Sequence, residues 1–505
     1  MSNFYLTLLT LIPFAGAILV ALLPDKRALI RVGGLAFSFA TLAATLALAF
    51  QYDRAAGGLQ FVEQRDWIPA LHIQYFLGAD GLSLLLLVLT ALVTPFALLA
   101  LGERSTRFGV SLILLLETTL LGTFTALDFI HWFLYYELSL VPAFFLIRMG
   151  GSAKATAAAT QMFIYTLLGG FAMLLGFLAI HQATGTFNLI ELADLARQSK
   201  LGHALSTSFH HWPWINLLVF SGVFLGLAVK VPVVPFHTWL PDAYTEAPAP
   251  VSMLLTGLLS KMGVYGFLRL LLPLFPGLML HFQKPLLGFA LVTIIFGAFA
   301  ALAQRDLKRI VAYSSINHLG YCLLGIFAVA AAGHASVTLG DRAAAMNGVL
   351  LQIFNHGLTA AALFCFIGFI ETRSGGLRGL DDFGGLRTVA PVLTGLMGIS
   401  IFSSLGLPGL NGFVGEFLVF KGSFAITPVA TALAAIGLFV TALFLLTIIQ
   451  RVFTGPLNPR WTHFPDLSLA ERVTVAPAIA LMFVIGICPQ LLITLFNQTV
   501  LNLLP

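Results

Sequence analysis

The stretch LAVKVPVVPFHTWLPDAYTEAPAPVS, residues 227–252, places Lys230 at the end of an apolar run and then interrupts that run with Pro232, Pro235 and Pro241. Proline ends or kinks a helix because it lacks a backbone donor and clashes with the preceding turn. In lipid, a broken helix is tolerated only where protein encloses it or where it lines a wet cavity. The stretch therefore predicts an interrupted membrane helix that lets backbone groups and water reach a buried charge.

The rest of the chain is apolar enough to require lipid as its solvent. Of its 505 residues, 59% are hydrophobic and only 9% are charged. About 14 apolar runs approach the roughly 20 residues that a helix needs to cross a bilayer. Backbone groups must be paired in lipid, so these runs are predicted to be helices. We therefore predict an all-α polytopic membrane protein with about 14 transmembrane helices.

A second interruption lies in SLGLPGLNGFVGEF, residues 404–417. The two interruptions fall on the seventh and twelfth predicted spans, a pattern typical of inverted repeats in transporters. The alternative is that proline and glycine are simply common in membrane helices. The repeat interpretation divides the chain into three N-terminal helices (1–108), a first five-helix repeat (109–275), an inverted second repeat (284–453) and a last helix (454–505).

The loop charges predict an orientation. With the N-terminus outside, about 16 Lys and Arg residues lie in inner loops against about 8 in outer loops, as the positive-inside rule requires. Both termini are then predicted on the outer, periplasmic side of a bacterial inner membrane. The net charge of +5 follows from this topology and does not indicate a nucleic-acid surface.

Ionisable side chains within the predicted spans are the candidate functional residues. A charge at the bilayer centre costs on the order of 2.5–3.5 kcal/mol, so its presence requires a reason. Acid, lysine and histidine side chains in different spans could together form a polar chain across the bundle. The members of this predicted chain are Glu137, Lys230, Lys261, His318, His356 and Glu416, and Glu117 is a weaker candidate.

Each candidate also has a structural interpretation. Glu137 and Lys230 could form an ion pair that either acts as an electrostatic switch or only bridges two helices. Lys261 has no acid nearby in sequence, and burial would destabilise its charged form and allow proton exchange; the alternative is that it snorkels to the interface. His318 and His356 have polar neighbours at helical spacing, Ser314 and Gln352, and serve either as proton relays or as helix–helix hydrogen bonds.

Asp242 and Glu246, just beyond the first interruption, are expected in a solvated inner mouth or loop. The cysteines are Cys322, Cys365 and Cys488, which lie in apolar runs without metal-site spacing. No glycine-rich loop follows a predicted strand. We therefore predict no metal site, bound cofactor or redox centre in this chain.

Six motifs resemble the antiporter-like subunits of respiratory complex I, and the resemblance covers nearly the whole chain. Within that family, Glu416 after the second interruption and the chain end soon after the last span favour the M branch. The motifs are YYELSLVPAFFLI (135–147), VKVPVVPFHTWLPDAYTEAPAPVSMLL (229–255), LLSKMGVYGFLR (258–269), YSSINHLGY (313–321), NHGLT (355–359) and LGLPGLNGFVGEF (405–417).

The resemblance implies a proton-translocating subunit of NADH:quinone oxidoreductase. Glu137 and Lys230 would be the coupling pair, Lys261 the central proton carrier, His318 and His356 relays, and Glu416 the distal proton site. It implies flavin mononucleotide, iron–sulfur clusters and quinone in partner subunits, and contacts with other antiporter-like subunits and lipids.

Two other functions stay open at this point. Subunits of cation/proton antiporter complexes and membrane-bound hydrogenases share the lysine-bearing spans. A structural scaffold, in which the charges only hold helices together, would make Lys261 important for assembly and not for pumping.

Overall fold

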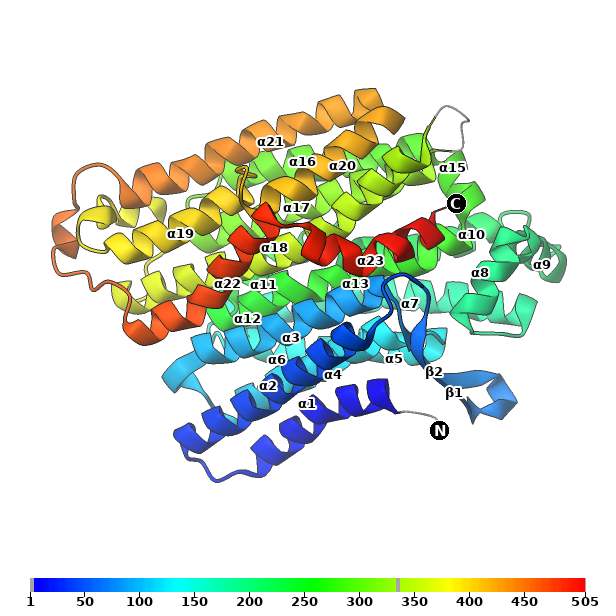
Figure 1. Cartoon of the computed structure of the whole chain (residues 1–505), viewed down its shortest axis with the longest axis horizontal. Helices are drawn as coiled ribbons and strands as arrows, with labels where there is room; N and C mark the ends of the chain where they lie inside the picture. The colour runs from blue at the N-terminus through cyan, green and yellow to red at the C-terminus, as the bar shows by residue number, and fades with distance from the viewer. Residues whose placement is uncertain (1–3, 333–336, 505) are drawn as a thin grey trace.

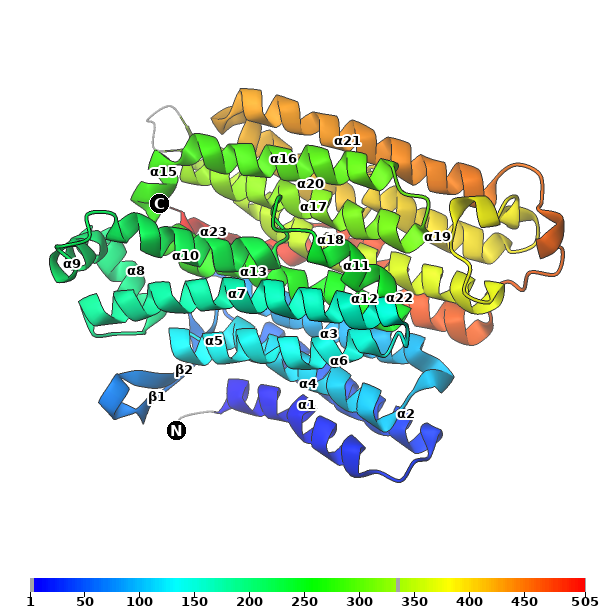
Figure 2. The same ribbon diagram turned by 180° about the vertical axis from the view of Figure 1, so that it is seen from behind.

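The computed structural model describes residues 4–332 and 337–504 as a bundle of long helices that lie side by side (Figures 1 and 2). The first part contains α1 (Tyr5–Leu22), α2 (Arg27–Gln51), β1 (Gln60–Ile68), β2 (Ile73–Ala79), α3 (Gly81–Leu101), α4 (Arg107–Thr125), α5 (Phe129–Leu138), α6 (Leu140–Arg148) and α7 (Ala153–Thr184). The middle part contains α8 (Leu189–Arg197), α9 (Lys200–Ser208), α10 (Ile215–Lys230), α11 (Trp239–Glu246), α12 (Ala249–Leu254), α13 (Ser260–Gly266), α14 (Leu272–Leu274), α15 (Pro276–His281) and α16 (Gln283–Leu302). The last part contains α17 (Leu307–Ala330), α18 (Leu339–Ser374), α19 (Pro391–Ser404), α20 (Asn411–Ile426), α21 (Pro428–Ile448), α22 (Leu469–Ile487) and α23 (Gln490–Leu503).

The predicted helical fold class is confirmed: the chain is a multi-pass membrane protein that is almost entirely α-helical. Within the described residues, 12 helices are long and apolar enough to cross a membrane. The two predicted interrupted spans are each divided into shorter helices, so the total of 14 stays a prediction. The span Ala249–Leu274 is buried along its whole length, whereas Arg27–Gln51 is mostly exposed at the periphery. The span that carries Lys261 is therefore central.

This central span is not a regular α-helix. Two π-helical turns, η3 (Leu255–Leu259) and η4 (Phe267–Leu271), lie on either side of α13. Turns of π-helix inside α-helices frequently mark functional sites, because they change which backbone carbonyls are bonded. Lys261 lies in the short α-helix between the two turns.

Both interruptions occur where the sequence predicts them. The first helix, α10, ends at Lys230, and α11 begins at Trp239. The second break is shorter than the predicted stretch, because α19 ends at Ser404 and α20 already begins at Asn411. Each broken span thus places helix ends inside the bundle. The terminal N–H and C=O groups there have no partner within the helix and can bond side chains or water.

A β-hairpin between α2 and α3 was not predicted. Strands β1 and β2 are antiparallel and lie at the end of the bundle where both described chain ends are found (Figure 1). The hairpin is joined to α1 because a carboxylate oxygen of Glu63 accepts a hydrogen bond from the Leu6 backbone N–H at 2.6 Å. The prediction concerned only the long apolar runs, and the hairpin lies between two of them.

Helices α18 and α20 pack closely through glycines. A Cβ atom on Gly348 of α18 would lie 2.3 Å from the backbone nitrogen of Val419 and 3.0 Å from the Gly415 carbonyl oxygen of α20. Small residues allow such close approach, on which membrane helix packing depends. This contact brings His356 and Glu416, on the same two helices, into one region.

We predict that Gly348→Leu destabilises the protein by about 1–3 kcal/mol or more, as overpacking of a tight interior does. Thermal unfolding of the purified protein in detergent measures the change. Gly395→Ala is the matched control, because a Cβ atom at this exposed helical glycine meets nothing within 4 Å. Equal melting temperatures for Gly348→Leu and the control would contradict the tight α18–α20 contact.

Candidate functional site: a buried polar row

Lys261 is completely buried at the centre of the bundle. Its Nζ lies 2.5 Å from the Thr256 carbonyl oxygen, 2.7 Å from His356 Nδ1 and 3.5 Å from Ser260 Oγ. None of these groups is acidic, but two of them, the Thr256 carbonyl oxygen and His356 Nδ1, are strong acceptors. Thr256 belongs to the π-turn η3, which places its carbonyl five residues before the lysine that binds it. The alternative of snorkelling to an interface does not fit a side chain with no exposed surface.

The contact between Lys261 and His356 depends on two glycines. A Cβ atom on Gly357 of α18 would lie 2.9 Å from the Gly257 carbonyl oxygen of η3. The two backbones thus approach each other more closely than larger residues would allow. An ammonium donates and cannot accept, so His356 Nδ1 accepts this bond when Lys261 is charged, and the imidazole proton then lies on Nε2.

His318 and Glu416 continue the row of buried polar side chains that begins with Lys261 and His356, and they form its other end. His318 Nδ1 lies 3.1 Å from Glu416 Oε1, and Ser404 Oγ lies 3.2 Å from His318 Nε2. Gln352 Nε2 also donates to Glu416 Oε1 at 3.3 Å. These contacts assign the Nδ1 proton of a neutral His318 to the bond with Glu416, while Nε2 accepts from Ser404. The carboxylate is thus held by two donors in the interior.

The second helix break holds this end in place. Glu416 Oε2 lies so close to Gly406 that a Cβ atom there would be 2.7 Å away, and Gly406 has φ of +79°, which favours glycine. Asn355 Nδ2 donates to the Asn411 carbonyl oxygen at 2.6 Å, and Ser403 Oγ donates to Asn411 Oδ1. Polar side chains of α18 and α19 therefore donate hydrogen bonds to the backbone and side-chain oxygens of Asn411, the first residue of α20.

A small space separates the two halves of the row. The rings of His318 and His356 have centroids 5.3 Å apart, with no direct hydrogen bond between them. Both rings, Glu416, Asn355 and Thr359 line a cavity of about 10 Å³. One water molecule needs roughly 10–15 Å³ of this kind of volume and two to four polar partners. The cavity thus has the size and lining for about one water between the imidazoles.

The predicted ion pair between Glu137 and Lys230 is not formed in this structure. Lys230 Nζ donates to the Tyr136 carbonyl oxygen at 3.1 Å and to Ser139 Oγ at 3.3 Å, and it lies 4.1 Å from the centre of the Tyr136 ring. The Glu137 carboxylate points to α7, where a Cβ atom on Gly170 would be 2.0 Å from Oε1. The α5–α6 junction at Ser139 offers the lysine nearer oxygens, so the two side chains make no direct contact.

The carboxylate oxygens of two acids, Glu137 and Glu117, are buried and make no hydrogen bond to described residues. Glu117, on α4, is 1% exposed and is not bonded to the row. A charged carboxylate without a partner is costly in such surroundings, so these groups are either protonated or act on distant charges. Glu117 therefore forms no hydrogen bond with Lys261, His318, His356 or Glu416.

A charged cluster, formed by Glu246, Asp306, Lys308, Glu371 and Arg378, joins α11, α17 and α18 at one end of the bundle. Lys308 Nζ lies 3.0 Å from Glu371 Oε2, and Arg378 pairs with Glu371 at 3.2 Å and with Asp306 at 2.5 Å. Asp242 and Glu246, expected at a solvated inner mouth or in a loop, lie on the helix α11 and pair with Arg309 (2.6 Å) and Arg378 (3.9 Å). The Asp242 side chain is 44% exposed, so only the loop alternative is wrong.

Buried hydroxyl groups lie between this charged cluster and Lys261. Lys308 Nζ and Ser252 Oγ both donate to the Ala247 carbonyl oxygen, at 3.0 and 3.4 Å. Tyr244 OH donates to the Leu255 carbonyl oxygen at 2.9 Å, close to Ser260. Sequence analysis missed these residues because buried serines and tyrosines are ordinary in membrane helices. Only their alignment distinguishes them, and the spacing of Ser252, Thr256 and Ser260 by four residues was the available signal.

Comparisons with known proteins agree with this geometry. The family described as "NADH:quinone oxidoreductase/Mrp antiporter, TM" matches residues 126–443. The chain belongs to this family. It is 33% identical to NADH-quinone oxidoreductase subunit M of Mycobacterium tuberculosis, over 99% of this chain and 93% of that protein. The match confirms the resemblance inferred from the six motifs.

Solved structures share the fold. A chain of respiratory complex I from Thermus thermophilus aligns with a TM-score of 0.84 and 28% identity, covering 99% of this chain and all of that one. A chain of the Mrp complex from Dietzia aligns with the same TM-score at 23% identity, covering 99% of this chain and 97% of that one. The second likeness concerns the fold alone, so the relatives named as oxidoreductase subunits, and not the fold, distinguish the two kinds of complex.

We predict that Glu416→Ala lowers the free energy of unfolding by about 1–3 kcal/mol, because His318 and Gln352 lose a buried acceptor. Thermal unfolding in detergent measures this change. Glu103→Ala is the control, since the Glu103 side chain is 87% exposed. If both variants melt with the wild-type protein, Glu416 does not hold the network described here.

Proposed function

We propose that this chain is the M-type, proton-translocating membrane subunit of an NADH:quinone oxidoreductase. The observation that carries the proposal is the buried row Lys261–His356–His318–Glu416, in which two direct contacts of 2.7 and 3.1 Å lie on either side of one water-sized space. Relatives named as subunit M at 33% identity support the identity of the complex.

Proton transfer along the row follows from its hydrogen bonds. Charged Lys261 gives a proton to His356 Nδ1, which leaves a neutral amine and an imidazolium. The His356 Nε2 proton then passes through the space to His318 Nε2, and the proton on His318 Nδ1 moves to Glu416. Each step breaks one N–H bond and forms one N–H or O–H bond, and histidine suits such transfer because both ring nitrogens take part.

In this proposal Lys230 and Glu137 control the charge of Lys261. Lys230 is the last residue of α10, where the helix dipole favours a positive charge. Approach of Glu137 would neutralise Lys230 and favour a charged Lys261, while separation would favour proton release to His356. Coulombic interaction in a medium of low dielectric is strong enough to act without contact.

The hydroxyl groups between the charged cluster and Lys261 offer a route for proton entry. Glu371 and Lys308 would supply the proton, and Ser252, Tyr244 and Ser260, with intervening water, would pass it to the lysine. Hydroxyl groups both donate and accept, so they relay protons without holding charge. The charged cluster lies at the end of the bundle opposite the chain termini, which the loop charges predict to be the inner side.

The chain would work within a larger membrane complex. Electrons would pass through flavin, iron–sulfur clusters and quinone in partner subunits, and this chain would hold no redox centre. It would contact other antiporter-like subunits and lipids in a bacterial inner membrane, with both termini outside. Helices 4–8 and 9–13 would form two inverted repeats, 109–275 and 284–453, each with one broken span, between the N-terminal helices 1–108 and the last helix 454–505.

An antiporter subunit is the alternative, because the family includes Mrp antiporters. The relatives named as oxidoreductase subunits make it less favoured. Dependence of transport on sodium separates the two: complex I activity driven by NADH would persist in sodium-free vesicles, and sodium/proton exchange would not.

We predict that Lys261→Ala abolishes coupled activity while the complex still assembles. The measurement follows NADH oxidation with a quinone and proton uptake by a pH-sensitive dye in sealed vesicles, with assembly checked on a native gel. Because every proton passes through Lys261 in this proposal, oxidation and pumping should both fall at least about tenfold, equivalent to ~1.4 kcal/mol.

Lys284→Ala is the control for this experiment, because Lys284 is an exposed lysine outside the row. An assembled Lys261→Ala complex with normal oxidation and pumping would overturn the row as the proton route. Loss of assembly with normal specific activity in the remaining complex would instead favour a scaffold.

We predict that Tyr244→Phe slows coupled NADH oxidation several-fold, because it removes one hydroxyl from the entry route and keeps the ring that packs against Phe364. Replacing the solvent by D₂O should slow the variant more than the wild type. Tyr5→Phe serves as the control at an exposed tyrosine. Identical rates and isotope effects in wild type and Tyr244→Phe would exclude this hydroxyl from the route.

A further inference from the structure

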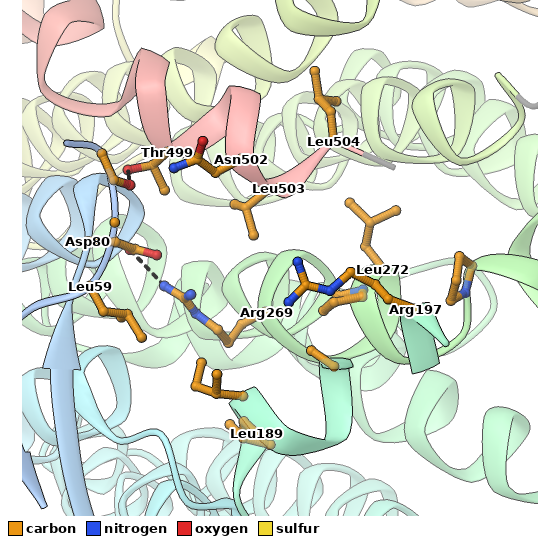
Figure 3. Close-up of a pocket in the computed structure, with 16 residues that line it drawn as sticks. Leu59, Asp80, Leu189, Arg197, Arg269, Leu272, Thr499, Asn502, Leu503 and Leu504 are labelled. Carbon is orange, nitrogen blue, oxygen red and sulfur yellow. Dashed lines mark hydrogen bonds and ion pairs between the residues drawn. The ribbon is translucent and has the colours of Figure 1, made fainter. Parts of the chain in front are cut away.

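A second polar site lies far from the row, at the end of the bundle that holds the chain termini. A cavity of about 280 Å³ is enclosed by α8, α14, α23 and the segment before β1 (Figure 3). It lies beside η4, the π-turn that follows the helix of Lys261. Nothing in the proposed proton route uses this cavity.

Two arginines line the cavity: Figure 3 shows the Arg197 side chain reaching into it from α8, while the Arg269 guanidinium extends toward Asp80. Arg269 is 7% exposed, and its Nη2 and Nε bond to Asp80 (2.7 Å), Ser83 (3.3 Å) and Tyr265 (3.2 Å). Its Nη1 makes no hydrogen bond within residues 4–332 and 337–504. One donor of a buried arginine therefore remains for a ligand.

Arg197 comes from the end of α8 and pairs with Asp194 through one nitrogen only. The Asn502 side chain of α23 also borders the cavity, and its Nδ2 has no acceptor among the described residues. The lining residues include two arginines and one acid, Asp80, and each arginine keeps N–H donors beyond its pair with a carboxylate. Guanidinium groups bind phosphate or carboxylate oxygens with directed hydrogen bonds.

The rest of the lining is apolar. Leu59, Leu189, Ile190, Leu272, Leu503 and Leu504 form the walls around the two arginines. A free phosphate ion would leave these walls in contact with water, and a purely apolar molecule would leave the remaining guanidinium N–H donors without acceptors. Only an amphiphile with an anionic head satisfies both parts of the lining.

We infer that this cavity binds an anionic phospholipid, with the phosphate between Arg197 and Arg269 and the first part of its acyl chains along the leucines. Small-molecule sites typically have about 300–1,000 Å³. A cavity of about 280 Å³ therefore takes the head group, while the rest of the chains extends into the bilayer. The lipid would join α8, α23 and the span of Lys261, three elements far apart in sequence. This inference does not depend on the proposed proton route.

A photoactivatable phosphatidylglycerol tests the inference on the assembled, purified complex. Cross-linked peptides should come from residues 189–197 and 490–504. Arg197→Gln should reduce this cross-linking about tenfold, because it removes a charge that faces the phosphate. Ala193→Trp, which fills the cavity and keeps both arginines, should abolish it. Arg54→Gln, at an exposed arginine of the same end, is the matched control and should change nothing.

Competition separates the possible ligands. Unlabelled phosphatidylglycerol should displace the probe, whereas phosphatidylcholine and inorganic phosphate should not. Equal displacement by phosphatidylcholine would show that the site does not select anions, and displacement by phosphate alone would show an ion site; either result overturns the inference. Unchanged cross-linking in Arg197→Gln would also overturn it, whatever the fate of Ala193→Trp.

Discussion

The structure depends on one constraint: a lysine buried at the centre of a membrane bundle must find its acceptors within the protein. Lys261 meets this requirement with a backbone carbonyl at 2.5 Å and an imidazole at 2.7 Å. The carbonyl is offered by the π-turn η3, and the imidazole is within reach because Gly257 and Gly357 let two backbones approach closely. The irregular helix and the tight helix contact are thus both consequences of solvating a single ammonium group without water.

The two broken spans serve the same constraint in different ways. The first break ends α10 at Lys230, so a helix carboxyl end and the carbonyl of Tyr136 surround the charge. The second break precedes Glu416, and its glycines make room for the carboxylate beside His318. A regular helix at either place would have bonded its own backbone and left the charge without these groups.

The sequence was sufficient to predict the helical class, both interruptions and the residues of the row, since charge, proline and glycine are all costly in lipid and therefore stand out. It could not predict contacts set by side-chain direction. Glu137 and Lys230 have opposite charges at similar depth, yet nearby oxygens hold the lysine and Glu137 turns to Gly170. The hairpin was missed because it lies between two long apolar runs, and the buried hydroxyl groups were missed because residues such as Tyr244 and Ser252 carry no composition signal.

The breaks in hydrogen bonding along the row are as important for controlled proton transfer as its contacts. A continuous hydrogen-bonded chain across the bundle would conduct protons down their gradient and dissipate it. Here the row is interrupted between His356 and His318, and Lys230 makes no contact with Lys261. Transfer across each gap then requires a water molecule or a side-chain movement, and both depend on the charge of the neighbouring residue. The electrostatic state of Lys230 and Glu137 would thus decide when protons pass, which a pump requires and a channel does not.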